Sequence, residues 1–362
     1  MDHFKQEALN EFKEKVMYIG AFVDGPLPKT EKILSEELPN RNPDGGNHVT
    51  LFYLGDYPEI GECLFDDVLA LPEEFTAQVS GYGFDGKNQG ISVSSDEYDF
   101  ENSRLYGNTK ATPHVTYSWD EIAGGMPVGT GKLDFHEIPA LESTKLKLRI
   151  KAYLFSDEMI SLQYFRDRAI GVIPPMSAGL YSAFSNHDQN TPYHCYDLRM
   201  HTIKVTEYVQ NNAISAGVPM DLRTPLVVAA QWHDIGKLFT KSQDENGFNV
   251  YPNHPKASAE LFDKVYVGND KALISFFISN HDSFLFYNKS DLTDALVASV
   301  KAGIQEKTPF TITSNDWRAL TLLMEADESA KNPVVRINGR VVRTLEEDIE
   351  KVRYLTKRIC DS

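Results

Sequence analysis

Six histidine and aspartate residues in the second half of the chain constrain its fold more than any other feature. His233 and Asp234 are adjacent at the end of an apolar, helix-like run, and His201 lies near the start of another. Imidazole and carboxylate groups desolvate poorly in such surroundings unless they are paired or ligated. A divalent metal ion supplies that pairing, because nitrogen and oxygen are its usual ligands. The remaining candidates each lie at the end or on the face of a predicted helix: His254, His281 and Asp327.

This pattern resembles the HD-domain phosphohydrolase superfamily, whose signature is H…HD…D. The resemblance covers roughly residues 175–340 and rests on YHCYDLRMHTIKV, WHDIGK, NHPKASAEL and ADESA. It is strongest toward the HD domains of tRNA nucleotidyltransferases and RNA-end phosphatases. It implies two metal sites that share Asp234, formed by His201, His233, Asp234 and Asp327 and by Asp234, His254 and His281. It also implies that Lys237 faces the phosphate of the substrate.

The expected ligands leave the identity of the metal open. Mixed imidazole and carboxylate ligands do not select sharply among Mn²⁺, Fe²⁺, Co²⁺ and Ni²⁺, and Mg²⁺ is also possible. We therefore expect divalent metal ions as cofactors, two of them by resemblance.

The length and composition set limits on architecture and surroundings. For 362 residues, two domains are the natural expectation, 1–170 and 171–362, with a linker inside AIGVIPPMSAG. No apolar run approaches a membrane span, and the first residues read as a charged amphipathic segment and not as a signal peptide. The three cysteines are scattered, which is typical of a reducing compartment. A cytoplasmic protein is expected, without a membrane partner.

The charge distribution limits the kind of nucleic acid that the chain can bind. The net charge is −16, and residues 1–170 carry 16 Lys and Arg against 29 Asp and Glu. Extended duplexes are normally held by a basic surface that releases counterions. Binding of extended duplex DNA is therefore not expected, whereas local basic residues or metal ions can still hold a nucleotide or the end of an RNA strand.

The first half predicts an α+β domain. Residues 3–15 have the periodicity of a helix, and residues 16–24, 48–55 and 113–119 read as strands. Further strands are predicted at EFTAQVSGYGFD and GISVSS, and at TKLKLRIKAYLFSD and MISLQYF. A polar loop, SSDEYDFENSRLYGNTKA, separates these two groups.

One tripeptide occurs twice in this half, as His48-Val49-Thr50 and as His114-Val115-Thr116. Residues i and i+2 of a strand share a face, so each His and Thr point the same way. Two such strands side by side would place two imidazoles and two hydroxyls around one phosphate. One imidazole can take a proton from the nucleophile and the other can protonate the leaving oxygen, while the threonine hydroxyls hold phosphate oxygens. The pattern does not say which histidine is the acid.

The doubled tripeptide resembles the 2H phosphoesterase superfamily, which includes the cyclic phosphodiesterase domains of tRNA ligases. The resemblance covers roughly residues 16–168 and rests on the two motifs and the order of the strands. It implies a bilobal α+β fold with pseudo-twofold symmetry and a metal-free opening of 2′,3′-cyclic phosphates to 2′-phosphates. The positions that it implicates are His48, Thr50, His114 and Thr116.

The second half predicts an all-α helical bundle of the HD type. In DLRTPLVVAAQWHDIGK, Thr224 is the expected N-cap and Pro225 the first helical residue. His254 should begin one helix, His281 should end another, and Ser314 or Asn315 should start the helix that carries Asp327. Ligands from several helices would then meet inside one bundle.

Two phosphoesterase-like sites on one chain suggest consecutive reactions, because a cyclic phosphodiester must be opened before its phosphate can be removed. We therefore expect an RNA or nucleotide end-healing hydrolase that acts on ends carrying a 2′,3′-cyclic phosphate. The chain has no GxxxxGK[ST] phosphate loop, so sealing would need a separate kinase or ligase. Two alternatives stay open: a phosphodiesterase that degrades small cyclic nucleotide signals, and a nucleotide-binding regulator with one inactive domain.

Overall fold

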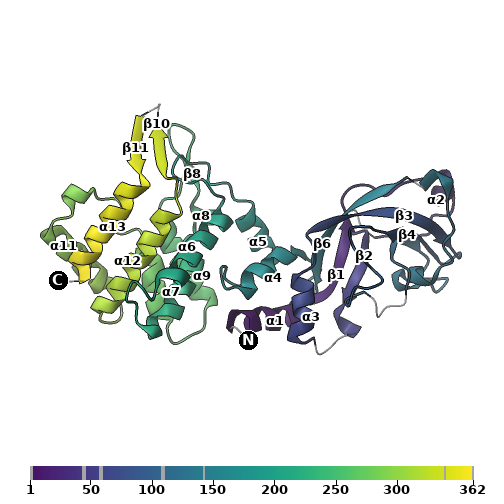
Figure 1. Cartoon of the computed structure of the whole chain (residues 1–362), viewed down its shortest axis with the longest axis horizontal. Helices are drawn as coiled ribbons and strands as arrows, with labels where there is room; N and C mark the ends of the chain where they lie inside the picture. The colour runs from purple at the N-terminus through teal and green to yellow at the C-terminus, as the bar shows by residue number, and fades with distance from the viewer. Residues whose placement is uncertain are drawn as a thin grey trace. The chain divides into compact units, whose positions relative to one another are not determined.

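The computed structural model describes residues 3–42, 46–56, 60–106, 111–141, 143–337 and 340–360. The chain forms two compact units, Met1–Ile170 and Gly171–Ser362, coloured purple to teal and teal to yellow in Figure 1. Of the polar loop expected in the first unit, residues 107–110 lie outside the described residues. No described helix has the length and apolar character needed to cross a membrane.

The first unit is an antiparallel sheet accompanied by short helices. Its strands are β1 (Val16–Val23), β2 (His48–Tyr53), β3 (Glu74–Phe84), β4 (Asn88–Ser94), β5 (His114–Trp119), β6 (Lys145–Leu154) and β7 (Met159–Ser161). Its α-helices are α1 (His3–Lys15), α2 (Glu31–Ser35), α3 (Glu62–Leu69) and α4 (Leu162–Ala169). Three 3₁₀ turns complete it: Leu54–Asp56, Pro127–Lys132 and Pro139–Leu141.

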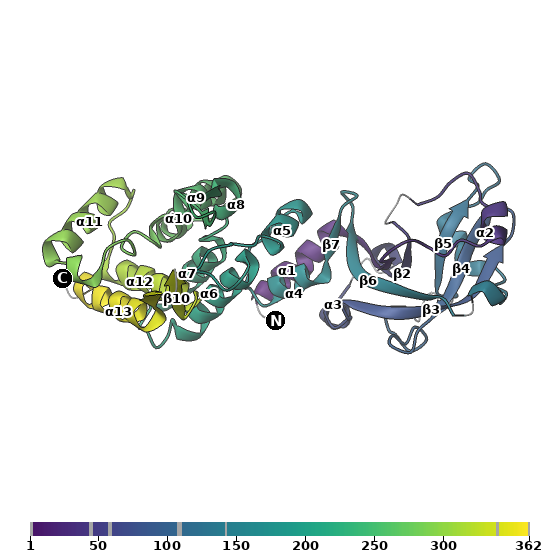
Figure 2. The same cartoon turned by 90° about the horizontal axis from the view of Figure 1, so that it is seen from above.

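The strands of this unit form a nearly closed barrel. In the described residues their order is β2-β1-β6-β3-β4-β5, with β7 paired to β6, and every pairing is antiparallel. Figure 2 shows β6, β3, β4 and β5 following one another across the sheet. The two end strands, β2 and β5, also approach each other. These are the two strands that carry the His-Val-Thr tripeptides, so closure of the barrel brings the two motifs together.

Both motif strands have the same local register. Gly20 of β1 pairs with Thr50, and Gly90 of β4 pairs with Thr116. In each ladder the register slips by one residue immediately after the threonine, which leaves Leu51 and Tyr117 without a partner across the strand. A bulge of this kind bends the strand and re-aims the side chains beside it. The two tripeptides are therefore repeated in local structure as well as in sequence.

Helices cover the buried face of this sheet. Along β6 the even-numbered residues from Leu146 to Leu154 are buried, whereas the odd-numbered ones are exposed or half-buried. This alternation is what a sheet with one apolar face requires. Phe12 of α1 is fully buried and its ring contacts those of Phe65 and Phe165, from α3 and α4. The sequence predicted an α+β unit, and the structure shows an antiparallel sheet with short helices.

The second unit is largely helical. Its helices are α5 (Ala178–Ser185), α6 (Leu198–Asn212), α7 (Met220–Trp232), α8 (Lys237–Thr240), α9 (His254–Val265), α10 (Lys271–Asn280), α11 (Asp294–Lys307), α12 (Ser314–Ser329) and α13 (Leu345–Cys360), with a 3₁₀ turn at Lys289–Asp291. α12 packs against α6, α7 and α13 (Figure 1). α10 packs against α7 and α9. The apolar core therefore surrounds the ends of α7, α10 and α12.

Two expectations for this unit were wrong in detail. The unit is not all-α, because β8 (Ser242–Gln243) pairs with β9 (Asn249–Val250) and β10 (Val334–Ile337) pairs with β11 (Arg340–Thr344). α7 begins at Met220, so Pro225 lies inside the helix and not at its first position. Pro225 costs the helix one backbone hydrogen bond, but its ring is buried in the core. The expected start of α12 is confirmed, and Thr313 caps it in a reciprocal pair with Asp316.

The glycine opposite Thr116 should tolerate no side chain. A Cβ atom at Gly90 would lie 2.3 Å from Thr130 Cγ2 and 2.7 Å from the Val115 carbonyl oxygen. Gly90→Ala should therefore lower the free energy of unfolding by about 1–3 kcal/mol, the usual cost of overpacking. Urea denaturation monitored by circular dichroism measures this change. Gly61→Ala is the control because a Cβ there meets nothing within 4 Å; equal midpoints for the two variants would contradict the tight fit.

Candidate metal centre and paired-histidine site

The second unit brings its six predicted ligands into one buried cluster. His201 lies on α6, His233 and Asp234 follow α7, and Asp327 lies in the last turn of α12. Two further histidines enter from elsewhere: His254 is the first residue of α9 and His281 follows the last residue of α10. Among the described residues, two overlapping sets have ligand atoms within 4.8 Å of one another: His201, His233, Asp234 and Asp327, and Asp234, His254 and His281.

Asp234 is the centre of this cluster because each of its oxygens faces different imidazoles. Its Oδ2 lies 3.1 Å from His201 Nε2 and 3.2 Å from His233 Nε2. Its Oδ1 lies 3.1 Å from His254 Nε2 and 3.7 Å from His281 Nε2. One carboxylate therefore belongs to both sets, as a bridging ligand must.

The hydrogen-bond partner of each Nδ1 atom indicates which ring nitrogen of the histidine carries a proton. In three of them Nδ1 lies 2.7–2.9 Å from the carbonyl oxygen three residues earlier: His233 to Ala230, His254 to Tyr251 and His281 to Ile278. His201 Nδ1 lies 3.3 Å from the Ala330 carbonyl oxygen. A carbonyl can only accept, so Nδ1 carries a proton, and in the neutral form of His233, His254 and His281 the Nε2 lone pair faces the carboxylates. Both ring nitrogens of His201 face acceptors; burial opposes its protonation, but hydrogen bonds to Asp234 and Asp327 outweigh burial and raise its pKa. Lone pairs that converge in this way need a cation between them.

The polar atoms at the centre lack ordinary partners. Among the described residues, His233 Nε2 and Asp234 Oδ1 are buried without a hydrogen-bond partner, whereas Asp234 Oδ2 is in an ion pair with Lys237. Burial alone would raise the pKa of Asp234, but the charges of His233 and Lys237 hold that pKa well below its usual value. Burial likewise opposes ionisation of Asp327, and Lys331 and His201 hold its pKa well below the usual value. Ionised carboxylates with orphaned imidazole nitrogens fit one or two divalent metal ions.

Lys237 lies beside this centre. Its Nζ is 2.6 Å from Asp234 Oδ2, and it donates a hydrogen bond to Gln189 Oε1 at 3.0 Å. It also lies 3.5 Å from His194 Nε2. Burial and the charge of Lys237 hold the pKa of His194 well below its usual value, so this imidazole is neutral.

An open cleft of about 810 Å³ reaches the cluster from the surface. Lys237, His254 and Asp327 form part of its lining, together with the cations Lys331, Arg343 and Lys351. Its volume lies in the range of small-molecule sites, roughly 300–1,000 Å³. A phosphate that entered it would meet both the metal ligands and positive charge.

Sequence reasoning missed Lys331 and Gln189. Lys331 lies 2.8 Å from Asp327 Oδ2 and 2.7 Å from Glu328 Oε1, which makes it the partner of a predicted ligand. The i, i+4 spacing of Asp327 and Lys331 on a helix was a signal that could have found it. No comparable signal marks Gln189, which lies in a loop 48 residues before Lys237.

The first unit brings together the two strands that carry His48 and His114. The two histidines have the same setting, because each Nδ1 lies 2.7–2.8 Å from the carbonyl oxygen two residues earlier, Gly46 and Thr112. Nδ1 therefore carries the proton, and each Nε2 is free to exchange one. Burial lowers the pKa of both imidazoles below the usual 6.5, and the charge of His114 lowers that of His48 further.

The two threonines occupy matching places beside these histidines. Thr50 and Thr116 each face a glycine of the neighbouring strand, and other side chains fill the space above these glycines: Phe22, Tyr18 and His48 above Gly20, and Thr130 above Gly90. Thr116 is buried and donates a hydrogen bond to the Pro127 carbonyl oxygen at 3.2 Å. On the β2 side, the His48 ring packs between Tyr18 and Phe22, with centroid separations of 4.8 and 5.0 Å. This packing fixes the imidazole plane.

Comparisons of the chain with protein-family models, with curated proteins and with solved structures gave no match. The site is therefore characterised by its geometry.

The two overlapping ligand sets predict how many metal ions each variant should bind. Asp234→Ala should remove the ligand that both sets share, so that purified protein loses all bound divalent metal. His254→Ala and His281→Ala should remove only the metal held by the second set. Metal content measured by inductively coupled plasma mass spectrometry gives the result for each variant. Asp282→Ala is the matched control, since it removes the aspartate of another His-Asp pair and this aspartate lies outside both sets; unchanged metal in Asp234→Ala would show that the cluster is structural.

Proposed function

We propose that the protein heals RNA ends in two hydrolytic steps. The paired histidines of the first unit open a terminal 2′,3′-cyclic phosphate, and the His/Asp cluster of the second unit removes the remaining phosphate. The observation that supports this most is the repeated register around the two His-Val-Thr strands, which gives the two motifs the same local structure. The HD-type cluster supplies the second reaction on the same chain.

In the first step, water attacks phosphorus and the bond from phosphorus to the 3′ oxygen breaks. One imidazole Nε2 takes the proton from the water, and the other imidazole gives a proton to the departing 3′ oxygen. The Thr50 hydroxyl, and the Thr116 hydroxyl once it releases the Pro127 carbonyl oxygen, would donate hydrogen bonds to the two non-bridging phosphate oxygens, where negative charge grows. The product is a 2′-phosphate beside a free 3′ hydroxyl.

The second step hydrolyses this monoester to inorganic phosphate and a 2′ hydroxyl. Divalent metal ions, when bound by the two overlapping sets, supply charge neutralisation and an activated water. Lys237 is placed to contact a phosphoryl oxygen from beside Asp234, and Gln189 holds its ammonium group in position. The neutral His194 can accept a hydrogen bond in the same pocket.

The alternative of a phosphodiesterase for small cyclic nucleotide signals uses the same two sites, and the acidic composition of the first unit favours it. A substrate panel separates the two proposals. Cyclic oligonucleotides and RNA that ends in a 2′,3′-cyclic phosphate would be compared under the same conditions.

Chelation should separate the two steps. Incubation of RNA ending in a 2′,3′-cyclic phosphate with the protein and EDTA should leave a 2′-phosphate end, whereas the metal-loaded protein should leave a free hydroxyl. His48→Ala and His114→Ala should each slow ring opening by about two to four orders of magnitude, the usual range for general acid–base groups. Mass spectrometry of the RNA identifies the ends. Loss of ring opening with EDTA, in protein that stays folded by circular dichroism, would contradict a metal-free first step.

Ring opening should have an acid-shifted pH profile. The pKa values of His48 and His114 both lie below the usual 6.5 in the free protein. The base thus stays deprotonated to a lower pH than usual, and the acid loses its proton at a lower pH than usual. The bell-shaped profile of kcat/KM should therefore be centred on the acid side of 6.5. Initial rates measured with EDTA present give this profile, and a centre at or above about pH 7 would be inconsistent with both shifts.

A further inference from the structure

One exposed strand face carries a concentration of positive charge that the acidic composition conceals. β6 reads KLKLRIKAYL, so that Lys145, Lys147, Arg149 and Lys151 alternate with buried apolar residues. These four residues, here called the β6 stripe, lie on one face because side chains of a strand alternate in direction. They are a quarter of the 16 Lys and Arg among residues 1–170. In a unit of strong negative charge, such a concentration of cations is a candidate binding surface for an anion.

The β6 stripe is in register with the paired-histidine site. Gly20 pairs with Lys151 on one side and with Thr50 on the other. Phe22 in the same way pairs with Arg149 and with His48. Lys151 and Arg149 thus lie two strands from the reactive residues, about 10 Å, on the same face of the sheet. Gly20 has no side chain of its own, and the rings of Tyr18 and Phe22 from the same strand lie over it, within 3.0–3.2 Å of the place that a Cβ atom would take.

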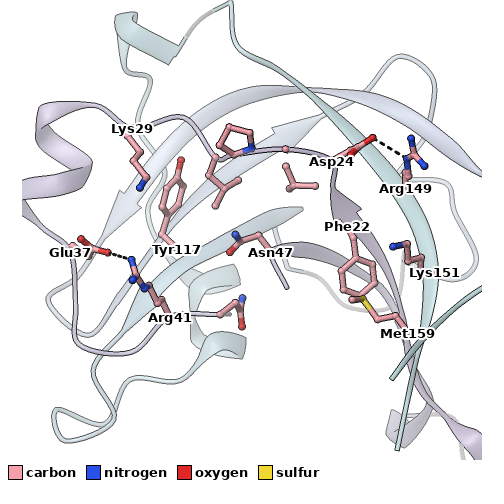
Figure 3. Close-up of a pocket in the computed structure, with 15 residues that line it drawn as sticks. Phe22, Asp24, Lys29, Glu37, Arg41, Asn47, Tyr117, Arg149, Lys151 and Met159 are labelled. Carbon is pink, nitrogen blue, oxygen red and sulfur yellow. Dashed lines mark hydrogen bonds and ion pairs between the residues drawn. The ribbon is translucent and has the colours of Figure 1, made fainter. Parts of the chain in front are cut away.

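A cleft of about 590 Å³ begins at this level of the sheet. Figure 3 shows Arg149, Lys151 and Phe22 on one side of it and Lys29, Arg41 and Tyr117 on the other, with Asn47 between them. Asn47 directly precedes the first tripeptide and Tyr117 directly follows the second. The cleft therefore adjoins both motifs, and its walls offer aromatic rings beside cations.

The cations of the stripe are available to a ligand. Within the described part of the chain, Lys145 and Lys151 make no ion pair. Arg149 pairs with Asp24 at 2.9 Å and Lys147 with Glu74 at 2.8 Å, but all four of these side chains are about half exposed. Ion pairs so exposed contribute little stability, so phosphate can replace the carboxylates at low cost.

The spacing of the stripe suits an extended strand of nucleic acid. Alternate residues of a strand lie about 6.6–6.8 Å apart, so the stripe spans about 20 Å from Lys151 to Lys145. Successive phosphates of an extended single strand have a similar separation. A duplex is a poor match, because one row of four cations contacts only one phosphate backbone and the rest of the unit is acidic.

We propose that the β6 stripe binds the backbone of single-stranded RNA, and that the cleft holds the nucleotides that precede the cyclic phosphate. This inference rests on the proposed function in one respect: it takes the reacting end of the RNA to lie at His48 and His114, which sets the direction of the RNA along the stripe. It names the substrate class as an oligonucleotide of about four residues or more and not a free mononucleotide. Lys151 and Arg149 contact the phosphates nearest the reacting end, and Lys147 and Lys145 contact those farther from it.

Binding of non-reactive RNA tests the stripe separately from catalysis. The probe is a fluorescent RNA pentamer with a free hydroxyl end, which neither step can alter, titrated with the full chain in its metal-loaded form. Fluorescence anisotropy gives Kd at several salt concentrations. A series from two to six nucleotides should gain affinity up to about four residues and then level off.

The double variant Lys145→Gln/Lys151→Gln should raise the Kd of the pentamer about ten-fold. The slope of log Kd against log salt concentration should fall by about 1.4, since each lost contact to a single strand removes about 0.7. Lys13→Gln/Lys87→Gln is the charge-matched control, because both lysines are exposed elsewhere in the same unit. Its Kd should match that of the wild type.

Two results would overturn the stripe proposal. One is an unchanged Kd in the stripe variant, or an equal loss in the control. The other is a dinucleotide that binds as tightly as the pentamer, which would favour small nucleotides as substrates. Failure of the end-healing proposal has a different signature: tight, stripe-dependent binding of the pentamer without opening of a terminal cyclic phosphate.

Discussion

The carboxylate of Asp234 is almost fully buried, and most of its near neighbours are imidazole nitrogens that present lone pairs. Such an arrangement is unstable by itself, because acceptors that face acceptors repel each other in a medium of low dielectric constant. The helices of the second unit nevertheless converge on this point. The ends of α7 and α10 and the start of α9 each supply a ligand, and each of those histidines is oriented by a carbonyl three residues earlier. Backbone hydrogen bonds of helix ends therefore fix the ligand geometry before any ion arrives.

Much of this centre was predictable because its ligands lie at helix boundaries, which leave marks in the sequence. The His-Asp pair followed by glycine, and the Asn-His-Pro start of α9, are both signals of this type. The position of Asp327 followed from the apolar period of its helix. The start of α7 was not predictable in the same way, because Thr224-Pro225 has the form of a helix start while the core accepts the proline inside the helix.

The first unit shows the limit of such reasoning more clearly. The repeated tripeptide predicted a pair, and strand periodicity predicted which side chains share a face. Neither could predict that β2 and β5 would be the two ends of one curved sheet, since that depends on pairings between strands far apart in the chain. The glycines opposite Thr50 and Thr116 are also visible in the sequence, but nothing local relates Gly20 to Thr50 or Gly90 to Thr116. The alternating cations of β6 are visible in the sequence. Only the pairing of β1 with β2 and with β6 shows that they lie near His48.

The contact between β2 and β5 determines where the barrel of the first unit can open most easily. Every other neighbouring pair of strands in the hydrogen-bonded order is joined by a ladder, whereas these two ends only approach each other. A local opening at this seam would part the two imidazoles while every ladder stayed intact. If the two imidazoles act together as proposed, opening of the seam would stop their reaction before spectroscopy detects any loss of secondary structure.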